Sequence, residues 1–405
     1  MQTSPSSRQT YLDWLRILAI FGVLVFHSAM PFGAELDWHI RNKDTSNIFL
    51  ELVSFMHLFR MPLLFFISGT VSYYMLLNRS GGSFIGLRVR RLLTPLILAI
   101  LIIVPPQVYL ERVNQGFTGN FWQFYSGMFS TGPYPQGNLS WHHLWFVAYL
   151  LIYDILCAPL FVWIISPKAA SFRNSLLWLA QGKRVFLLTL PGILLYGALA
   201  VHFPETNDLI HDGCCFFYWL CFLIPGFVCI AQPALMDSLE RNRRFAFLIA
   251  FLSILSVNYV RWNDIHPWDV LANWQSDPRT YGFIALKALC GWAWVLTAIG
   301  YGKKYLNKPH ASLHYLNQAV YPFYILHQTV IVILAFYVVK TTDTIATKYV
   351  FILMTAFVVS MSIYHLLIRP YNVCRFLFGM KSAGTPPAKS KQSVIRQEQM
   401  SLPVS

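Results

Sequence analysis

Long apolar runs recur along the whole chain, and short polar segments separate them. Ten of these runs are candidates for membrane-spanning helices, which need about 20 residues each. Their approximate bounds are 11–31, 49–77, 92–110, 142–166, 184–201, 214–232, 245–260, 280–301, 319–339 and 349–369. The pattern predicts an all-α fold, a polytopic integral membrane helical bundle of about ten transmembrane helices.

The composition agrees with a membrane protein and argues against a soluble one. Of the 405 residues, 56% are hydrophobic and only 12% are charged, against about 25% charged in soluble domains. The net charge is +14, but the basic residues form short clusters between apolar runs, as topology signals do. Binding of nucleic acid is therefore not expected.

Charged residues in the loops predict the orientation of the bundle. Basic clusters such as Arg88 to Arg91 and Arg241 to Arg244 follow every second run, whereas acidic residues dominate the other loops. The positive-inside rule then places both termini in the cytoplasm. We expect a cytoplasmic segment over 1–10, a membrane domain over 11–370 and a basic, disordered tail over 371–405. The seven cysteines lack metal-ligand spacing, so no metal is expected.

Ionisable residues inside the apolar runs are the first candidates for function. Placing such a group at mid-membrane costs about 2.5–3.5 kcal/mol of free energy, even on lenient membrane-insertion scales. It therefore needs a partner, a water-filled cavity or a functional role. Arg16 and His27 are eleven residues apart, which places both on one helix face, about 16 Å apart along the axis. The alternatives are an interfacial anchor for Arg16 and a structural hydrogen bond for His27.

The second run carries His57 and Arg60 before Pro62. Their spacing of three residues predicts a shared helix face. They reach the depth of His27 if the helix continues through Pro62 with only a kink. The following Ser68-Gly69 predicts close helix packing.

Arg88 and Arg91 share a helix face at the cytoplasmic start of the third run. Such clusters are often only topology signals. Guanidinium groups also bind phosphate oxygens in bidentate fashion. Together with Arg16, these residues predict an anion-binding mouth on the cytoplasmic side.

Further candidates lie in later runs. His142 and His143 occupy the exported end of the fourth run, and Tyr324 and His327 lie within the ninth. Asp154 and Lys287 are buried charges whose partners the sequence does not identify. For His327, a catalytic or orienting role and a structural hydrogen bond are both open.

The exported segments carry two weaker signals. Residues 111–140 are rich in Gly, Pro and aromatics, which suggests a loop that packs back over a pocket. His39 and Asp44 match the H-x4-D pattern of soluble acyltransferases, but they lack the strand and helix context of that family and receive no role.

Five short motifs occur together in order: YLDWLRILAIFGVLVFH, FRMPLLFFISG, RVRR, WHHLWF and YPFYILH. As a set they resemble the membrane-bound acyltransferase family 3, over a stretch from Tyr11 to about Arg369. The resemblance implies transfer of an acyl group from cytosolic acyl-CoA, as succinyl-CoA or acetyl-CoA, to an extracytoplasmic carbohydrate. It also implies a bacterial inner-membrane location, with the lipid bilayer as partner.

Roles for the candidates follow from that resemblance. Arg16, Arg88 and Arg91 would bind coenzyme A, and His27 would act as a general base or as a covalent acyl carrier. Arg60 would stabilise an oxyanion or hold a succinyl carboxylate, and His327 would assist catalysis. His57, His142, His143 and Tyr324 would contact substrate. Two alternatives remain, a transporter of an anionic or glycan substrate and a scaffold whose charges only pair helices.

Overall fold

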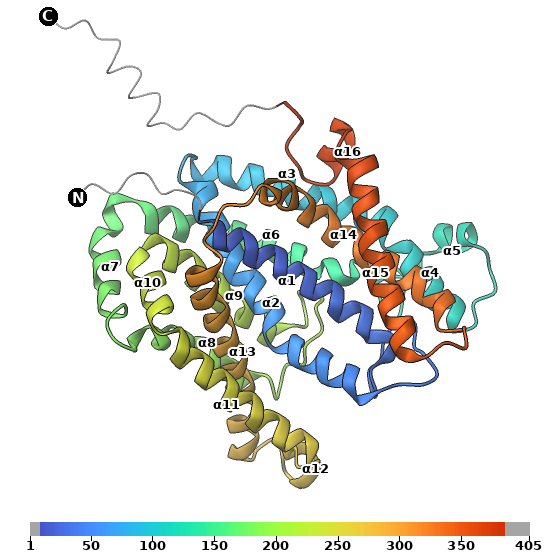
Figure 1. Cartoon of the computed structure of the whole chain (residues 1–405), viewed down its shortest axis with the longest axis horizontal. Helices are drawn as coiled ribbons and strands as arrows, with labels where there is room; N and C mark the ends of the chain where they lie inside the picture. Colours follow the sequence, from blue (N-terminus) through green and yellow to red (C-terminus); the bar gives the residue numbers. More distant parts are fainter. Residues whose placement is uncertain (1–8, 385–405) are drawn as a thin grey trace, which may run out of the picture.

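A computed structural model describes residues 9–384 of the chain. Residues 1–8 and 385–405, with most of the expected N-terminal segment and tail, lie outside the described residues. The helices, shown in Figure 1, are α1 (Thr10–Ala29), α2 (Asn47–Leu76), α3 (Gly81–Leu98), α4 (Pro105–Asn114), α5 (Phe121–Gly127), α6 (Trp145–Ile165), α7 (Ala170–Ser175), α8 (Leu190–Leu199), α9 (Gly213–Ala231), α10 (Pro233–Arg241), α11 (Arg243–Trp262), α12 (Pro267–Val270), α13 (Pro278–Tyr305), α14 (Ser312–Val338), α15 (Ile345–Ile363) and α16 (Asn372–Leu377).

The all-α prediction is confirmed, because the described residues form helices and loops and only two isolated β-bridges. Nine helical segments of this part of the chain are long and apolar enough to cross a membrane. The tenth predicted span, 184–201, is a shorter apolar helix over Arg184–Leu199. It is short because its first six residues form a 3₁₀ segment and α8 begins only at Leu190.

Two boundaries differ from the predicted ones. The third spanning segment runs over Gly81–Asn114 and begins eleven residues before the predicted start at residue 92, because Ser80 caps the helix by accepting a hydrogen bond from the Ser83 amide. Within the segment predicted as a disordered tail, α16 is an ordered helix with a buried Arg375. The Arg375 guanidinium donates to the carbonyl oxygens of Arg369 and Lys381, which explains the order.

Helix α1 lies at the centre of the bundle, where it contacts α2, α13, α14 and α15. Helix α2 continues through Pro62, which meets the condition for placing His57 and Arg60 near His27, and it packs most extensively against α9. The helices that carry the candidate residues therefore share one core, and their polar side chains are brought together inside it.

The contact between α2 and α9 depends on two glycines. A Cβ atom at Gly69 would collide with the carbonyl oxygen of Leu223, and one at Gly226 would collide with that of Phe66. The close packing predicted at Ser68-Gly69 is thus confirmed. The two backbones approach so closely that only glycine, which has no Cβ atom, fits at these positions.

We expect Gly69→Ala to lower the free energy of unfolding by about 1–3 kcal/mol, because the added methyl group must push apart two backbones. Thermal unfolding of the purified protein in nanodiscs measures the effect. The matched control is Gly82→Ala in α3, where an added Cβ meets nothing and the helix should be as stable or more stable. Equal stability of the two variants would contradict the prediction.

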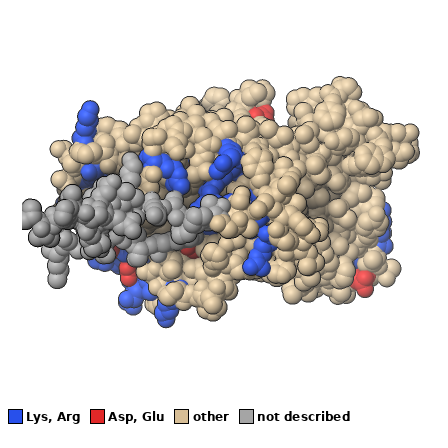
Figure 2. Space-filling model, turned by 90° about the horizontal axis from the view of Figure 1, so that it is seen from above, with Lys and Arg blue, Asp and Glu red and all other residues tan. Residues whose placement is uncertain are grey.

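Figure 2 shows the face of the molecule at the top of Figure 1, over which Lys and Arg side chains are scattered and few acidic side chains appear. Helices α3 and α16 lie at this face. Basic side chains thus outnumber acidic ones on this face.

Candidate functional site

His27 of α1 and His327 of α14 form the centre of the site. The His27 Nδ1 atom lies 2.9 Å from the His327 Nε2 atom, and the two rings stack with centroids 5.1 Å apart. His327 is fully buried, and His27 is partly accessible. The pair joins two helices that are 300 residues apart in the chain.

The hydrogen bonds of this pair assign its tautomers. The His327 Nδ1 atom lies 2.6 Å from the backbone oxygen of Tyr324. A carbonyl oxygen only accepts, so His327 Nδ1–H is the donor and a neutral His327 has its lone pair on Nε2. His27 then donates its Nδ1–H to His327. The lone pair of His27 is left on Nε2, the position from which an imidazole accepts a proton.

His143 and Tyr324 complete this layer of aromatic rings. His143 Nε2–H donates to the Ile325 carbonyl oxygen over 3.1 Å, and the Tyr324 hydroxyl donates to the backbone oxygen of His143. The His143 ring centroid lies 5.2 Å from that of His327 and 6.4 Å from that of His27. Three histidines predicted from separate motifs are thus neighbours.

His57 and Arg60 of α2 lie next to Phe26 of α1. The Arg60 guanidinium stacks over the Phe26 ring at 3.3 Å, and its Nη1 lies 3.5 Å from the His57 Nδ1. The His57 Nε2 pairs with the Glu205 carboxylate over 3.4 Å. Burial opposes ionisation of Glu205, but His57, Asn207 and Arg60 together outweigh it and hold the pKa of this carboxyl at about 2. Glu205 therefore stays ionised and compensates the positive charge beside it.

Arg16 occupies the same face of α1 as His27, as the spacing predicts. Its Nη2 donates to the Asn317 Oδ1 of α14 over 2.6 Å, and an ion pair of 3.8 Å links it to Asp13. Both α1 residues therefore contact α14, at positions ten residues apart. The prediction of a shared face is confirmed.

A cavity of about 690 Å³ lies between this arginine and the histidine layer. Gln9 and Lys381, close to the two ends of the described chain, lie at its wall, and so do Tyr324 and Phe146. Tyr324 packs against both Phe146 and His327. His27 and His327 do not line the cavity, and the Tyr324 side chain lies between the cavity and His327. Its basic lining residues are Arg16, Arg79, Arg88, Arg91, Arg375 and Lys381.

Arg88 has a buried partner that the sequence did not identify. It forms an ion pair with Asp154 of α6, and the Ser72 hydroxyl donates to the other carboxylate oxygen over 2.7 Å. This answers the open question about Asp154. The charge of Arg88 is compensated locally, whereas no ion pair in the described structure involves Arg91.

Comparison with known proteins identifies the family to which the chain belongs. Residues 9–365 match the acyltransferase family 3, described as an Acyltransferase domain. The chain belongs to acyltransferase family 3. It is therefore an acyltransferase.

Relatives agree with this family assignment. Glucans biosynthesis protein C of Escherichia coli O1:K1 is 25% identical over 276 residues, which cover 63% of this chain and 67% of the relative. The protein of the same name from Salmonella heidelberg (strain SL476) is 23% identical over 406 residues, which cover 96% and 98%. No solved structure matches the chain significantly.

Some residues of this acyltransferase site were missed from the sequence. Glu205 lies in a loop that supplied only a topology signal, and Asn317 carries no motif. His39 was set aside with its H-x4-D pattern, yet it is bonded to Glu111 of α4. One signal in the sequence could have revealed this contact: Glu111 is a carboxylate at the end of an apolar run. Its side chain is nearly inaccessible in the folded protein.

The aromatic loop of this acyltransferase does not cover either cavity described here. Helix α5 of that loop packs its rings on one another and on Tyr109 of α4, and no residue of 111–140 lines the two cavities. The second cavity, of about 420 Å³, is lined by Lys287, Tyr196, Trp268 and Trp274. Lys287 thus faces an aromatic cavity.

Proposed function

We propose that this acyltransferase moves an acyl group, succinyl or acetyl, from cytosolic acyl-CoA to a hydroxyl of an extracytoplasmic glycan. The observation that carries the proposal is the hydrogen-bonded chain from the Tyr324 carbonyl through His327 to His27. It leaves the Nε2 lone pair of His27 available as a base in the core of the bundle. The relatives named glucans biosynthesis protein C support a glycan acceptor and a bacterial inner-membrane location.

In this mechanism His27 Nε2 accepts the proton of the sugar hydroxyl. The oxygen attacks the thioester carbonyl, a C–O bond forms, and the C–S bond breaks. The thiolate leaves with the proton returned by His27, so free coenzyme A is the second product. His327 acts through His27, whose ring it orients, and is a positioning residue. His143 packs against both rings and keeps them in place.

Arg60 is the cation nearest to this chemistry. It stacks on Phe26, the neighbour of His27 in the sequence, and its charge acts on His27. A fixed guanidinium at this position stabilises negative charge that develops on the carbonyl oxygen. The same group would bind the carboxylate of a succinyl donor. His57 connects Arg60 to Glu205 and so sets its position.

The donor would enter the cavity of about 690 Å³ from the end that carries the arginines. Its volume is typical of a cofactor site. Phosphates would bind at Arg16 and Arg91, with Arg79 and Arg375 nearby. The acyl chain would extend toward Tyr324, which contacts His327 through its ring. Tyr324 must swing aside for the thioester to reach His27.

We expect the acceptor to approach from the opposite side. With both termini in the cytoplasm, as the loop charges predict, this is the exported side, and the loop that holds Trp268 and Trp274 lies there. Their cavity of about 420 Å³ offers flat aromatic faces beside the cation of Lys287. Sugar rings stack on such faces, and an ammonium group suits a polyhydroxylated or anionic glycan.

The test is release of free thiol from succinyl-CoA or acetyl-CoA by the full chain in nanodiscs, with a periplasmic glycan extract as acceptor. Thiol release that requires the glycan supports the proposal. Label from the acyl donor that stays on the protein without an acceptor would replace the general-base step by a covalent one at His27. Glycan flux across proteoliposomes without any donor would support the transporter alternative.

We expect Arg91→Ala to raise the KM for acyl-CoA about tenfold or more with little change in kcat, because a charge-assisted phosphate contact contributes about 1.5–3 kcal/mol. Steady-state kinetics at varied donor concentration measures it. The matched control is Arg90→Ala, an exposed neighbour on α3 that does not line the cavity. The same KM for both variants would remove Arg91 from the donor site.

A further inference from the structure

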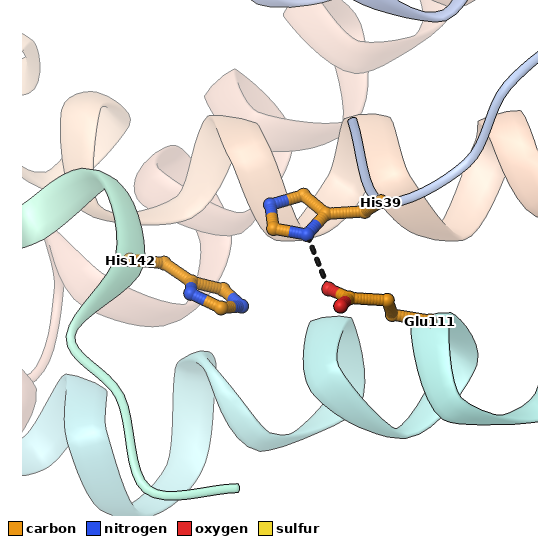
Figure 3. A group of neighbouring side chains, drawn as sticks. All are labelled: His39, Glu111 and His142. Carbon is orange, nitrogen blue, oxygen red and sulfur yellow. Dashed lines mark hydrogen bonds and ion pairs between the residues drawn. The ribbon is translucent and has the colours of Figure 1, made fainter. Parts of the chain in front are cut away.

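Three side chains with metal-binding atoms meet apart from the histidine layer. His39 comes from the loop between α1 and α2, Glu111 from α4, and His142 from the turn before α6 (Figure 3). One potential ligand atom from each lies within 4.8 Å of the others. Figure 3 shows all three side chains pointing toward one another, with the hydrogen bond between His39 and Glu111.

Without a metal, this cluster leaves two buried polar atoms without partners. They are the Nε2 of His142 and the Oε1 of Gln328, whose side chain contacts His39. Buried polar atoms are almost always hydrogen-bonded, so each orphan needs an explanation. His142 is also held at φ 41°, in the left-handed region that a residue with a side chain rarely adopts.

A metal ion gives the His142 orphan atom a partner. The His142 Nε2 becomes a ligand while its Nδ1–H donates to the Ser140 Oγ, 2.8 Å away. His39 binds through Nδ1 and keeps one proton, now on Nε2. A flip of the Gln328 amide gives this proton an acceptor in Oε1, in exchange for the present bond from Gln328 Nε2 to the Gln107 Oε1.

Each of the three ligands then has an outer hydrogen bond, as ligands of metal sites usually do. Glu111 accepts from the Tyr134 hydroxyl over 3.2 Å. Arg112 lies 3.7 Å from Glu111, but its guanidinium also binds the loop oxygens of Asn138, Pro135 and Gly137.

We infer that His39, Glu111 and His142 bind one divalent transition-metal ion, of which Zn²⁺ is the representative. Two imidazoles and one carboxylate form a donor set typical of zinc, with bonds of about 2.0–2.2 Å and a fourth position left open. The three side chains close around the ion by small rotations. The ion ties the α1–α2 loop and the start of α6 to α4. This differs from the sequence-based expectation that no metal is bound, and it does not depend on the proposed reaction.

The test measures zinc bound to the full chain in nanodiscs after incubation with Zn²⁺ and removal of the excess. We expect about one zinc per chain and a higher thermal unfolding temperature, which a chelator reverses. Glu111→Gln keeps the shape of the side chain and removes its charge, and His142→Asn removes the unpartnered ring nitrogen. Each should lower retained zinc at least tenfold and abolish the zinc-dependent thermal shift.

The matched control is His211→Ala, which removes an exposed histidine from a pair with Asp208 in another loop. It should retain wild-type zinc content. Elution of each variant as a monodisperse protein shows that it folds. If Glu111→Gln does not fold, His142→Asn alone decides the result. Zinc content that is negligible in the wild type, or equal in the wild type and the ligand variants, would overturn the site.

Discussion

Replacing His27 by alanine should reduce glycan-dependent thiol release by about 100-fold or more, because a positioned general base contributes about 10²–10⁴ to the rate. The conservative variant His27→Asn is the sharper test. Its amide can still donate to His327 Nε2, but it has no basic nitrogen in place of His27 Nε2. Both variants should therefore be equally inactive if the Nε2 lone pair is what matters.

The measurement is the rate of thiol release by protein in nanodiscs at saturating donor and glycan. His211→Ala, in an exposed loop, is the control that should keep wild-type activity. Partial activity of His27→Asn beside an inactive His27→Ala would indicate that the bond to His327 holds the helices together and that His27 is not the base. Full activity of both would remove His27 from the site.

Replacing Asp154 by alanine should lower the free energy of unfolding by about 3–5 kcal/mol, since Arg88 would keep a buried charge with no counterion. The pair lies inside the bundle, where Asp154 is fully buried and Arg88 nearly so. The double variant Arg88→Met with Asp154→Leu removes both charges and replaces them by apolar side chains of similar size. It should regain most of the lost stability.

Thermal unfolding in nanodiscs measures this effect, and the double variant also tests the role of Arg88. If the KM of the folded double variant for acyl-CoA matches the wild type, Arg88 is structural and Arg91 and Arg16 hold the donor. A tenfold rise assigns Arg88 to the phosphates as well. Wild-type stability of Asp154→Ala would contradict the ion pair as a stabilising contact.

Much of the architecture follows from local sequence. The spanning helices are determined by runs of apolar residues of bilayer length, and the shared face of Arg16 and His27 by helical periodicity. Run length and helical periodicity depend only on residues that are close in the chain, so both can be recognised in the sequence. The short helix over Arg184–Leu199 was less well predicted, because its hydrophobicity is that of a spanning helix and only the backbone conformation of its first turns differs.

The pairing of ionisable groups was decided by the tertiary structure. His27 meets His327, Arg88 meets Asp154, and His57 meets Glu205, in each case across more than 60 residues of chain. A sequence states which groups need a partner, because burial of a charge is costly. It does not state which helix supplies the partner, since that depends on helix packing and rotation. Histidines from three motifs could be predicted as important, whereas the tautomer of His27 required the carbonyl oxygen of Tyr324.

The sequence alone thus determined the class of protein and the residues under electrostatic constraint. The tertiary structure decided which of them act together. The cluster of His39, Glu111 and His142 illustrates the difference, because its members are separated by 72 and 31 positions and share no periodicity. Only the packing of α4 against α14, with the loops that flank α2 and α6, brings these side chains within reach of one another.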